Sequence, residues 1–225
     1  MQLVDIFLEP AKVFAAQKEK PTFLLPLIVF VLATAAMILS YFLRVDPAWF
    51  TDHVLLMAGQ QMTSAEIAQA KQFMPGARTQ GYIGAATSAL FIPAVFCIGA
   101  VYYFLAGKIA GAAISFKQGL ALVTWSSMPT VLGLLVGTVG ALTMAPQTGQ
   151  EQLMLTHLDP LLVKLPYDHA LSGIAKGFDL LAFWAIGLGA LGWKTLTGGR
   201  WPGAIFVAAL PSLVIYGVWL AFALT

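Results

Sequence analysis

Long runs of uncharged, mostly apolar residues dominate this sequence and limit the folds that it can adopt. A helix needs about 20 apolar residues to cross the roughly 30 Å hydrocarbon core of a bilayer. The composition is typical of such proteins, since 59% of the residues are hydrophobic and only 10% are charged. We therefore predict an all-α, polytopic integral membrane protein, a single membrane domain over residues 1–225 that forms a bundle of five transmembrane helices. The predicted spans are residues 23–43, 81–107, 119–145, 171–193 and 201–225.

The fourth predicted span contains the one acidic residue found in any span, Asp179. Its charge-free part, residues 180–193, has 14 residues, which is roughly 21 Å of helix and too short to cross. Extending the helix back to Leu171 gives enough length and places Lys176 and Asp179 three residues apart on one face, where they can pair. We expect Asp179 at the outer interface, held by Lys176 or by backbone donors.

The third predicted span contains Pro129, which removes a backbone donor, so we expect a kink there with hydroxyls such as Ser126 bonding freed carbonyls. Gly133 and Gly137 in the same span would let another helix approach closely. In the second span, Pro93 predicts a bend.

The segments between the spans predict how the chain crosses the membrane. Residues 1–22 mix apolar and lysine side chains, as in an amphipathic segment on the membrane surface, although a loose terminus is the alternative. Residues 44–80 and 146–170 form long polar loops, and Thr63 with Glu66 predicts a capping box for a short helix in the first. Seven of the 12 Lys and Arg residues lie in the N-terminal segment and the two short links, which predicts a cytoplasmic N-terminus, outer loops 44–80 and 146–170, and a C-terminus outside.

Motifs of membrane enzymes are absent from the sequence. It has no HExxH, no GxSxG accompanied by a histidine, no pair of intramembrane acids and no phosphate-binding glycine motif, so we predict no enzyme and no cofactor. The basic residues are scattered, which argues against nucleic acid as a partner. Asp179 leaves open a small-solute or ion transporter, although the spans offer few other polar groups at mid-depth.

The three histidines all lie in the predicted outer loops, each beside an acid in the sequence. Imidazole and carboxylate groups are ordinary ligands of divalent ions, so His53, His157 and His169 are candidate metal ligands. Solvated surface histidines are the alternative, because the spacing is not specific to metal sites.

The stretch 179–184, DLLAFW, with Leu188 and Gly192 after it, resembles the fourth-helix pattern of the bacterial branch of the Yip family (Ypt-interacting proteins, Yip-one domain). In that pattern an Asp opens the span, a Trp follows five residues on, and Leu and Gly come four and eight residues later; Leu181 departs from it, where an aromatic is expected. The sequences EPAKVF at 9–14 and FKQ at 116–118 match as well. The family-pattern positions are Pro10, Pro129, Asp179, Trp184 and Gly192.

The resemblance implies a multi-pass protein of the bacterial inner membrane with no catalytic residues to carry over. Eukaryotic relatives bind small Rab-type GTPases, but this sequence lacks their cytosolic Asp-Leu-Tyr-Gly-Pro stretch, so small GTPase binding is not predicted. Our leading hypothesis is non-catalytic membrane organisation or partner scaffolding, with the lipid bilayer and other membrane proteins or a second copy as partners. A transporter centred on Asp179 is the alternative, and an outer-loop metal-binding protein is the third.

Overall fold

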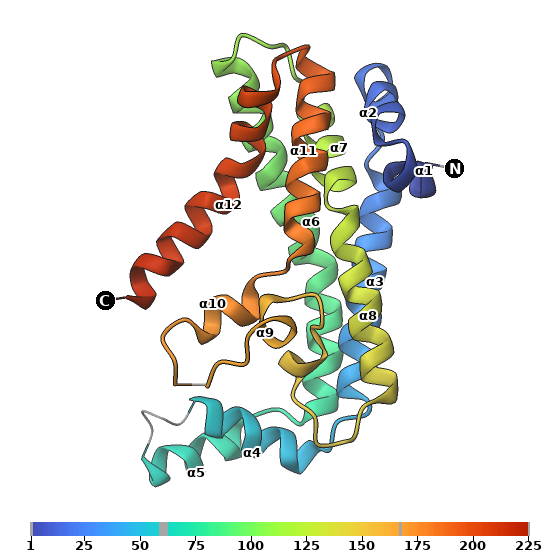
Figure 1. The fold of residues 1–225 in the computed structure, drawn as a ribbon. Helices are drawn as coiled ribbons and strands as arrows, with labels where there is room; N and C mark the ends of the chain where they lie inside the picture. Colours follow the sequence, from blue (N-terminus) through green and yellow to red (C-terminus); the bar gives the residue numbers. More distant parts are fainter. Residues whose placement is uncertain (1, 59–62, 167, 225) are drawn as a thin grey trace.

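The structure is a computed structural model that describes residues 2–58, 63–166 and 168–224. It is all-helical: 79% of the described residues lie in helices, and they form no strand. Figure 1 shows the order of the elements along the chain. They are α1 (Gln2–Leu8), α2 (Pro10–Glu19), α3 (Leu24–Phe42), α4 (Pro47–Ala58), α5 (Ser64–Phe73), α6 (Ala77–Ile109), α7 (Phe116–Ser126), α8 (Met128–Thr143), the 3-10 helix η2 (Gln150–Leu153), α9 (Leu158–Leu161), α10 (Ser172–Gly177), α11 (Leu181–Thr197) and α12 (Trp201–Ala223).

Three helices in the described part of the chain, α3, α6 and α12, are long and apolar enough to cross a membrane. The pair α7 and α8 passes the same test if it forms one bent span, which makes up to four. The fourth predicted span is shorter than expected, because α11 has 17 residues and rises only roughly 25 Å. The structure therefore supports a polytopic membrane protein but does not confirm a count of five.

The predicted kink near Pro129 is confirmed. Helix α7 ends at Ser126, α8 begins at Met128, and the two are bent by 41°. Pro129 lies in the first turn of α8, where backbone N–H groups have no acceptor within the helix, so α8 loses no hydrogen bond through the missing N–H. The hydroxyls of Ser126 and Ser127 both donate to the carbonyl of Val123, at 3.2 and 2.8 Å, but this carbonyl also accepts the Ser127 N–H and so is not one that the break frees.

The N-terminal helices pack onto the bundle. Ile6, Val13 and Phe14 are at most 2% exposed and belong to the main apolar core, together with residues of α7 and α11. The chain then turns into α3 through Thr22, whose N–H donates to the buried Gln17 side chain at 2.6 Å. Trp125 of α7 donates to the Thr22 carbonyl at 2.7 Å, so this polar turn is tied to the core.

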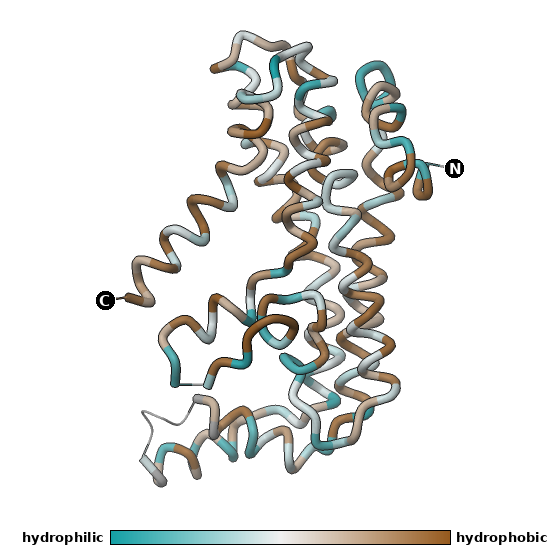
Figure 2. The backbone as a smooth tube through the Cα atoms, viewed as in Figure 1, coloured by the Kyte–Doolittle hydropathy of each residue, from teal (hydrophilic) through white to brown (hydrophobic). Residues whose placement is uncertain are grey.

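The two ends of the molecule are more polar than the helices between them (Figure 2). One end, the α2 end, carries α2 with the α6–α7 and α11–α12 links, and the opposite, α4 end carries α4 and α5 (Figure 1). Figure 2 shows hydrophilic residues gathered in α2 and in the loops of the α4 end, whereas α3, α8 and α12 are mostly hydrophobic. Polar ends that flank apolar helices are what a membrane-spanning bundle requires.

The capping box predicted at Thr63 is confirmed. The Thr63 hydroxyl accepts from the Glu66 N–H, and the Thr63 N–H donates to the Glu66 carboxylate at 2.6 Å. These hydrogen bonds from Thr63 lower the pKa of Glu66, because they stabilise the charged form. The sequence did not predict α4, which packs its Phe50 and Val54 against Tyr41 and the end of α3.

The segment after α8 folds back along that helix. Side chains of this segment pack against three glycines of α8: a Cβ added at Gly140 would contact Leu153, one at Gly137 would lie 3.1 Å from Met154, and one at Gly133 would lie 2.7 Å from the Thr156 hydroxyl. Gly133 and Gly137 were predicted to let another helix approach α8 closely. In the structure these glycines are covered mainly by the segment after α8, and Met37 of α3 also contacts Gly137.

The helix predicted from Leu171 through Trp193 is interrupted, which corrects the predicted fourth span. Helix α10 ends at Gly177, Phe178 has an extended backbone, and α11 begins at Leu181. Instead of continuing the helix, the Phe178 carbonyl accepts from Leu158 N–H and the Thr156 carbonyl accepts from Leu180 N–H, both at 2.9 Å. Lys176 and Asp179 consequently do not share one helical face.

Candidate functional site

Asp179 lies at the break that precedes α11. Its carboxylate Oδ1 accepts a hydrogen bond from the N–H of Leu181, the first residue of α11, at 3.0 Å. Its backbone forms an antiparallel bridge with His157. An acid that accepts an N–H in the first turn of a helix satisfies one of the donors left free there and is favoured by the helix dipole.

The carboxylate of Asp179 also faces α8. A Cβ added at Gly133 would lie 3.4 Å from Asp179 Oδ2 and 2.7 Å from the Thr156 hydroxyl. Only a residue without a side chain allows α8 to lie this close to both groups. Gly133 therefore sets the space in which the Asp179 carboxylate sits.

The structure places Asp179 beside the middle of two long helices, α3 and α8. Gly133 lies ten residues before Thr143, the end of α8, which is roughly 15 Å along the helix. Helices α3 and α8 run side by side with Gly137 against Met37, so Gly133 is level with residue 33, nine residues from either end of α3. Asp179 takes this place beside α8 because the chain folds back along α8 before α11 begins, and its position at the membrane interface stays a prediction.

The three histidines have separate partners. His53 Nε2 lies 3.2 Å from Glu151 Oε1, His157 Nδ1 contacts the Lys176 carbonyl, and His169 Nδ1 accepts from the Leu171 N–H at 3.1 Å. Within residues 2–58, 63–166 and 168–224, no three His, Cys, Asp or Glu side chains gather in a way that could hold a metal ion.

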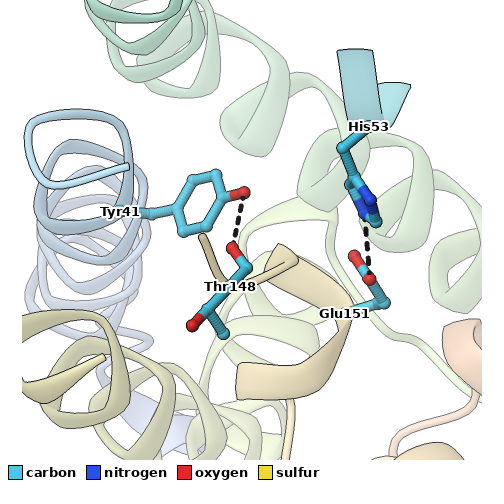
Figure 3. A network of polar contacts seen from close by, with 4 residues as sticks. All are labelled: Tyr41, His53, Thr148 and Glu151. Atoms are coloured by element: carbon cyan, nitrogen blue, oxygen red, sulfur yellow. Dashed lines mark hydrogen bonds and ion pairs between the residues drawn. The ribbon is translucent and has the colours of Figure 1, made fainter. Parts of the chain in front are cut away.

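Two polar contacts, one of them made by His53, fasten the loop of residues 146–170 to the rest of the α4 end. Figure 3 shows His53 of α4 beside Glu151, and the Tyr41 hydroxyl donating to the Thr148 carbonyl at 3.2 Å. The His53 and Glu151 side chains are only 16% and 18% exposed, and the imidazole stacks on Trp49 with centroids 4.5 Å apart. These contacts link α3, α4 and the segment around η2.

Three of the family-pattern residues lie where the N-terminal helices meet α11. Trp184 makes an edge contact with Phe7 of α1, with ring centroids 5.6 Å apart. A Cβ added at the buried Gly192 would lie 2.8 Å from the Phe14 ring and closer still to Leu122. Pro10 occupies the first position of α2, where its fixed φ suits a helix start.

A contact that the sequence did not suggest fixes α12. Pro211 has no N–H, so the carbonyl of Val207, four residues earlier, loses its helical donor. The Tyr102 hydroxyl of α6 donates to that carbonyl at 2.6 Å. No local pattern predicts this bond, because it joins residues 105 positions apart in the sequence.

A cleft with a volume of about 620 Å³ lies beside this contact. It is lined by residues of α6, of the α7–α8 break, of α11 and of α12. On α11 its lining begins at Ala182, one turn beyond Asp179. The lining is mostly apolar, and its hydroxyl groups belong to Tyr102, Tyr103, Ser126, Ser127, Thr130 and Ser212.

Comparison with known proteins identifies the family. The model of the Yip1 domain matches residues 4–222. The chain is also 25% identical over 222 residues to the membrane protein YknW of Bacillus subtilis (strain 168), an alignment that covers 99% of this chain and 88% of YknW. No solved structure matches at a comparable level of significance. The protein is therefore a multi-pass membrane protein that belongs to the Yip1 domain family.

Proposed function

We propose that this protein is a non-catalytic organiser of the membrane, which scaffolds another membrane protein or a second copy of itself by packing a transmembrane helix against α12. The proposal places it in the bacterial inner membrane, with a cytoplasmic N-terminus and the C-terminus outside. It rests on one observation: α12 is long and apolar enough to cross a bilayer, yet its own chain leaves most of its surface uncovered. Only 6% of its most apolar 18-residue window is buried, against 22% for α3.

One side of α12 is suited to a partner helix. Five residues recur at helical spacing on the side of α12 opposite the cleft, the last of them directly after the end of the helix, and all are exposed, with Phe206 at 60% and Leu213 at 63%. We call them the outer face of α12: Phe206, Leu213, Gly217, Leu220 and Leu224. Nothing lies within 4 Å of a Cβ added at Gly217, so a neighbouring backbone has room to approach there.

The contacts of Asp179 give less support to transport. Its Oδ1 accepts from Leu181 N–H, and the nearby cleft is apolar and begins beyond it on α11. A carrier site usually gathers several polar groups from interrupted helices around the substrate. The metal hypothesis gains nothing from histidines that each have another partner.

Site-specific photocrosslinking in intact membranes tests the proposal. We would place a photoreactive phenylalanine at Leu213 or Leu220, and as a matched control at Leu32, an exposed apolar residue of α3 (63%). The expected result is a discrete protein adduct from the two α12 positions and only lipid adducts from Leu32. Gly217→Leu should abolish the adduct while the protein still folds, because nothing of its own chain lies near that position.

Lipid adducts alone from Leu213 and Leu220 would overturn the proposal. An adduct that also forms from Leu32 would do the same, because it would mark random collision rather than a face of α12. Mass spectrometry of the adduct separates a second copy of this chain from a different membrane protein.

A further inference from the structure

The cleft beside Pro211 opens sideways between two of the helices long enough to cross a membrane. Its rim carries exposed apolar side chains: Val95 and Ile98 of α6, 43% and 70% exposed, and Val214 and Ile215 of α12, 54% and 62% exposed. Its inner wall includes Phe96 and Tyr103, which are 7% and 6% exposed. The mouth therefore faces the side of the bundle that the bilayer surrounds, and not a polar end.

Six hydroxyl groups line the cleft, and four of them, those of Tyr102, Ser126, Ser127 and Thr130, donate to backbone carbonyls, whereas Tyr103 and Ser212 supply the other two. Ser127 and Thr130 donate to carbonyls of their own chain at 2.8 and 2.7 Å, and Tyr102 donates to Val207 at 2.6 Å. Among the residues that the structure describes, no buried side-chain nitrogen or oxygen lacks a hydrogen-bond partner. A polar solute would find few free donors here, and its own polar groups would lose their bonds to water.

An empty apolar cleft is unfavourable in a bilayer, because the atoms that line it lose their dispersion contacts. Water does not fill it well either, since a buried water needs two to four polar partners. A volume of about 620 Å³ is within the range of small-molecule sites. We propose that this cleft binds the acyl chain of a membrane lipid, inserted sideways between α6 and α12.

The bond between Tyr102 and Val207 positions the wall of this site. Before Pro211, α12 packs on α11 through Ala204 and Ala208, which are buried. After it, α12 diverges from the bundle (Figure 1) and is held at its far half by Tyr216, whose hydroxyl donates to the Gly177 carbonyl at 3.2 Å. Attachment on both sides of Pro211 keeps a space between α12 and α6 that an acyl chain can occupy.

Labelling with a lipid that carries a diazirine within its acyl chain tests the proposal. The full-length protein would be reconstituted in phosphatidylcholine and phosphatidylglycerol vesicles that contain a trace of this lipid, irradiated and digested. We expect labelling at residues 210–215 and 95–99 to exceed labelling of the exposed face of α3, which meets only bulk lipid. Ala185→Phe, which fills the cleft from α11, should lower the cleft labelling roughly tenfold, equivalent to about 1.4 kcal/mol of binding free energy.

Gly187→Phe is the matched control on the same helix. Nothing lies within 4 Å of a Cβ added there, and Gly187 is exposed, so this variant should label as the parent protein does. If Ala185→Phe fails to fold, Ile215→Trp at the exposed rim covers the mouth of the cleft and should give the same loss.

Two results would overturn the acyl-chain site. One is cleft labelling no stronger than that of α3, or unchanged by the variant that fills or covers the cleft. The other is preferential labelling of the cleft by a water-soluble diazirine glycoside, which would indicate a polar solute. Neither result bears on protein adducts from Leu213 or Leu220, which lie on the opposite side of α12, so this site and the scaffolding role fail separately.

Discussion

At the scale of single residues, the packing depends on glycines that leave no room for a side chain. Gly192 lets α11 meet Phe14 of α2 and Leu122 of α7, two side chains that are fully buried. This contact joins the N-terminal helices to the main core of the bundle.

Gly192→Ala should destabilise the protein by about 1–3 kcal/mol, because the new methyl group overlaps Phe14 and Leu122 in a filled core. Gly187→Ala on the same helix should be neutral or stabilising by up to about 1 kcal/mol, since nothing lies near that position and alanine favours helix. Unfolding of both variants by denaturant in detergent micelles measures the difference. Equal stabilities would contradict this account of the interface.

Asp179→Asn should leave the fold intact at a cost of about 0.5–2 kcal/mol, since the amide oxygen can still accept from the Leu181 N–H. Asp179→Leu should cost more, because that donor then loses its acceptor. The same unfolding measurement compares the two variants. Uptake of a solute into liposomes, driven by protons or sodium and abolished by Asp179→Asn without unfolding, would instead support the transporter.

The family resemblance pointed to Asp179, Gly192 and Trp184 as pattern positions, but it could not predict which residues each of them contacts. Asp179 was expected to pair with Lys176 from three residues away on one helix, which assumed a continuous helix. The bridge between His157 and Asp179 replaces that helix, and it depends on a segment that lies 22 residues earlier. Contacts between segments distant in sequence leave no local pattern.

At the scale of helices, local chemistry predicts breaks and caps well. The kink at Pro129 and the capping box at Thr63 both follow from the covalent structure of a few adjacent residues, and both are present. The start of α11 was predicted about ten residues too early, because hydropathy alone does not separate a helix from an apolar segment folded against one.

Tyr102→Phe tests whether α6 holds α12. Removing the hydroxyl leaves the Val207 carbonyl without its donor, so we expect a loss of about 0.6–1.7 kcal/mol, from the average to the maximum measured for hydrogen bonds between helices in a membrane. Tyr82→Phe, at a position that is 59% exposed on the same helix, should cost much less. The comparison uses denaturant unfolding in bicelles, and equal effects of both variants would contradict a role for Tyr102 in fixing α12.

At the scale of the whole molecule, the arrangement of the ends suits five crossings even though α11 is short. The N-terminal helices and both short links lie at the α2 end, whereas α4 and α5 lie at the other (Figure 1). Helix α11 rises roughly 25 Å from Leu181 to Thr197, and the folded-back segment that precedes it occupies the space beside the lower half of α8. A short helix and this segment can together fill the depth of one span.

Reporter fusions decide the number of crossings. Seven of the 12 basic residues lie at the α2 end, namely Lys12, Lys18, Lys20, Lys108, Lys117, Lys194 and Arg200, and such residues favour the cytoplasmic side. A reporter in the 198–200 link should therefore be cytoplasmic, and one fused after residue 225 should be periplasmic, with a fusion near Gly76 as the periplasmic control. If α11 does not cross, the link and the control report the same side. That result would leave four crossings and bring the C-terminus to the cytoplasmic side. Helix α12 would then cross the membrane in the opposite direction, so its outer face would meet any partner with the reverse orientation.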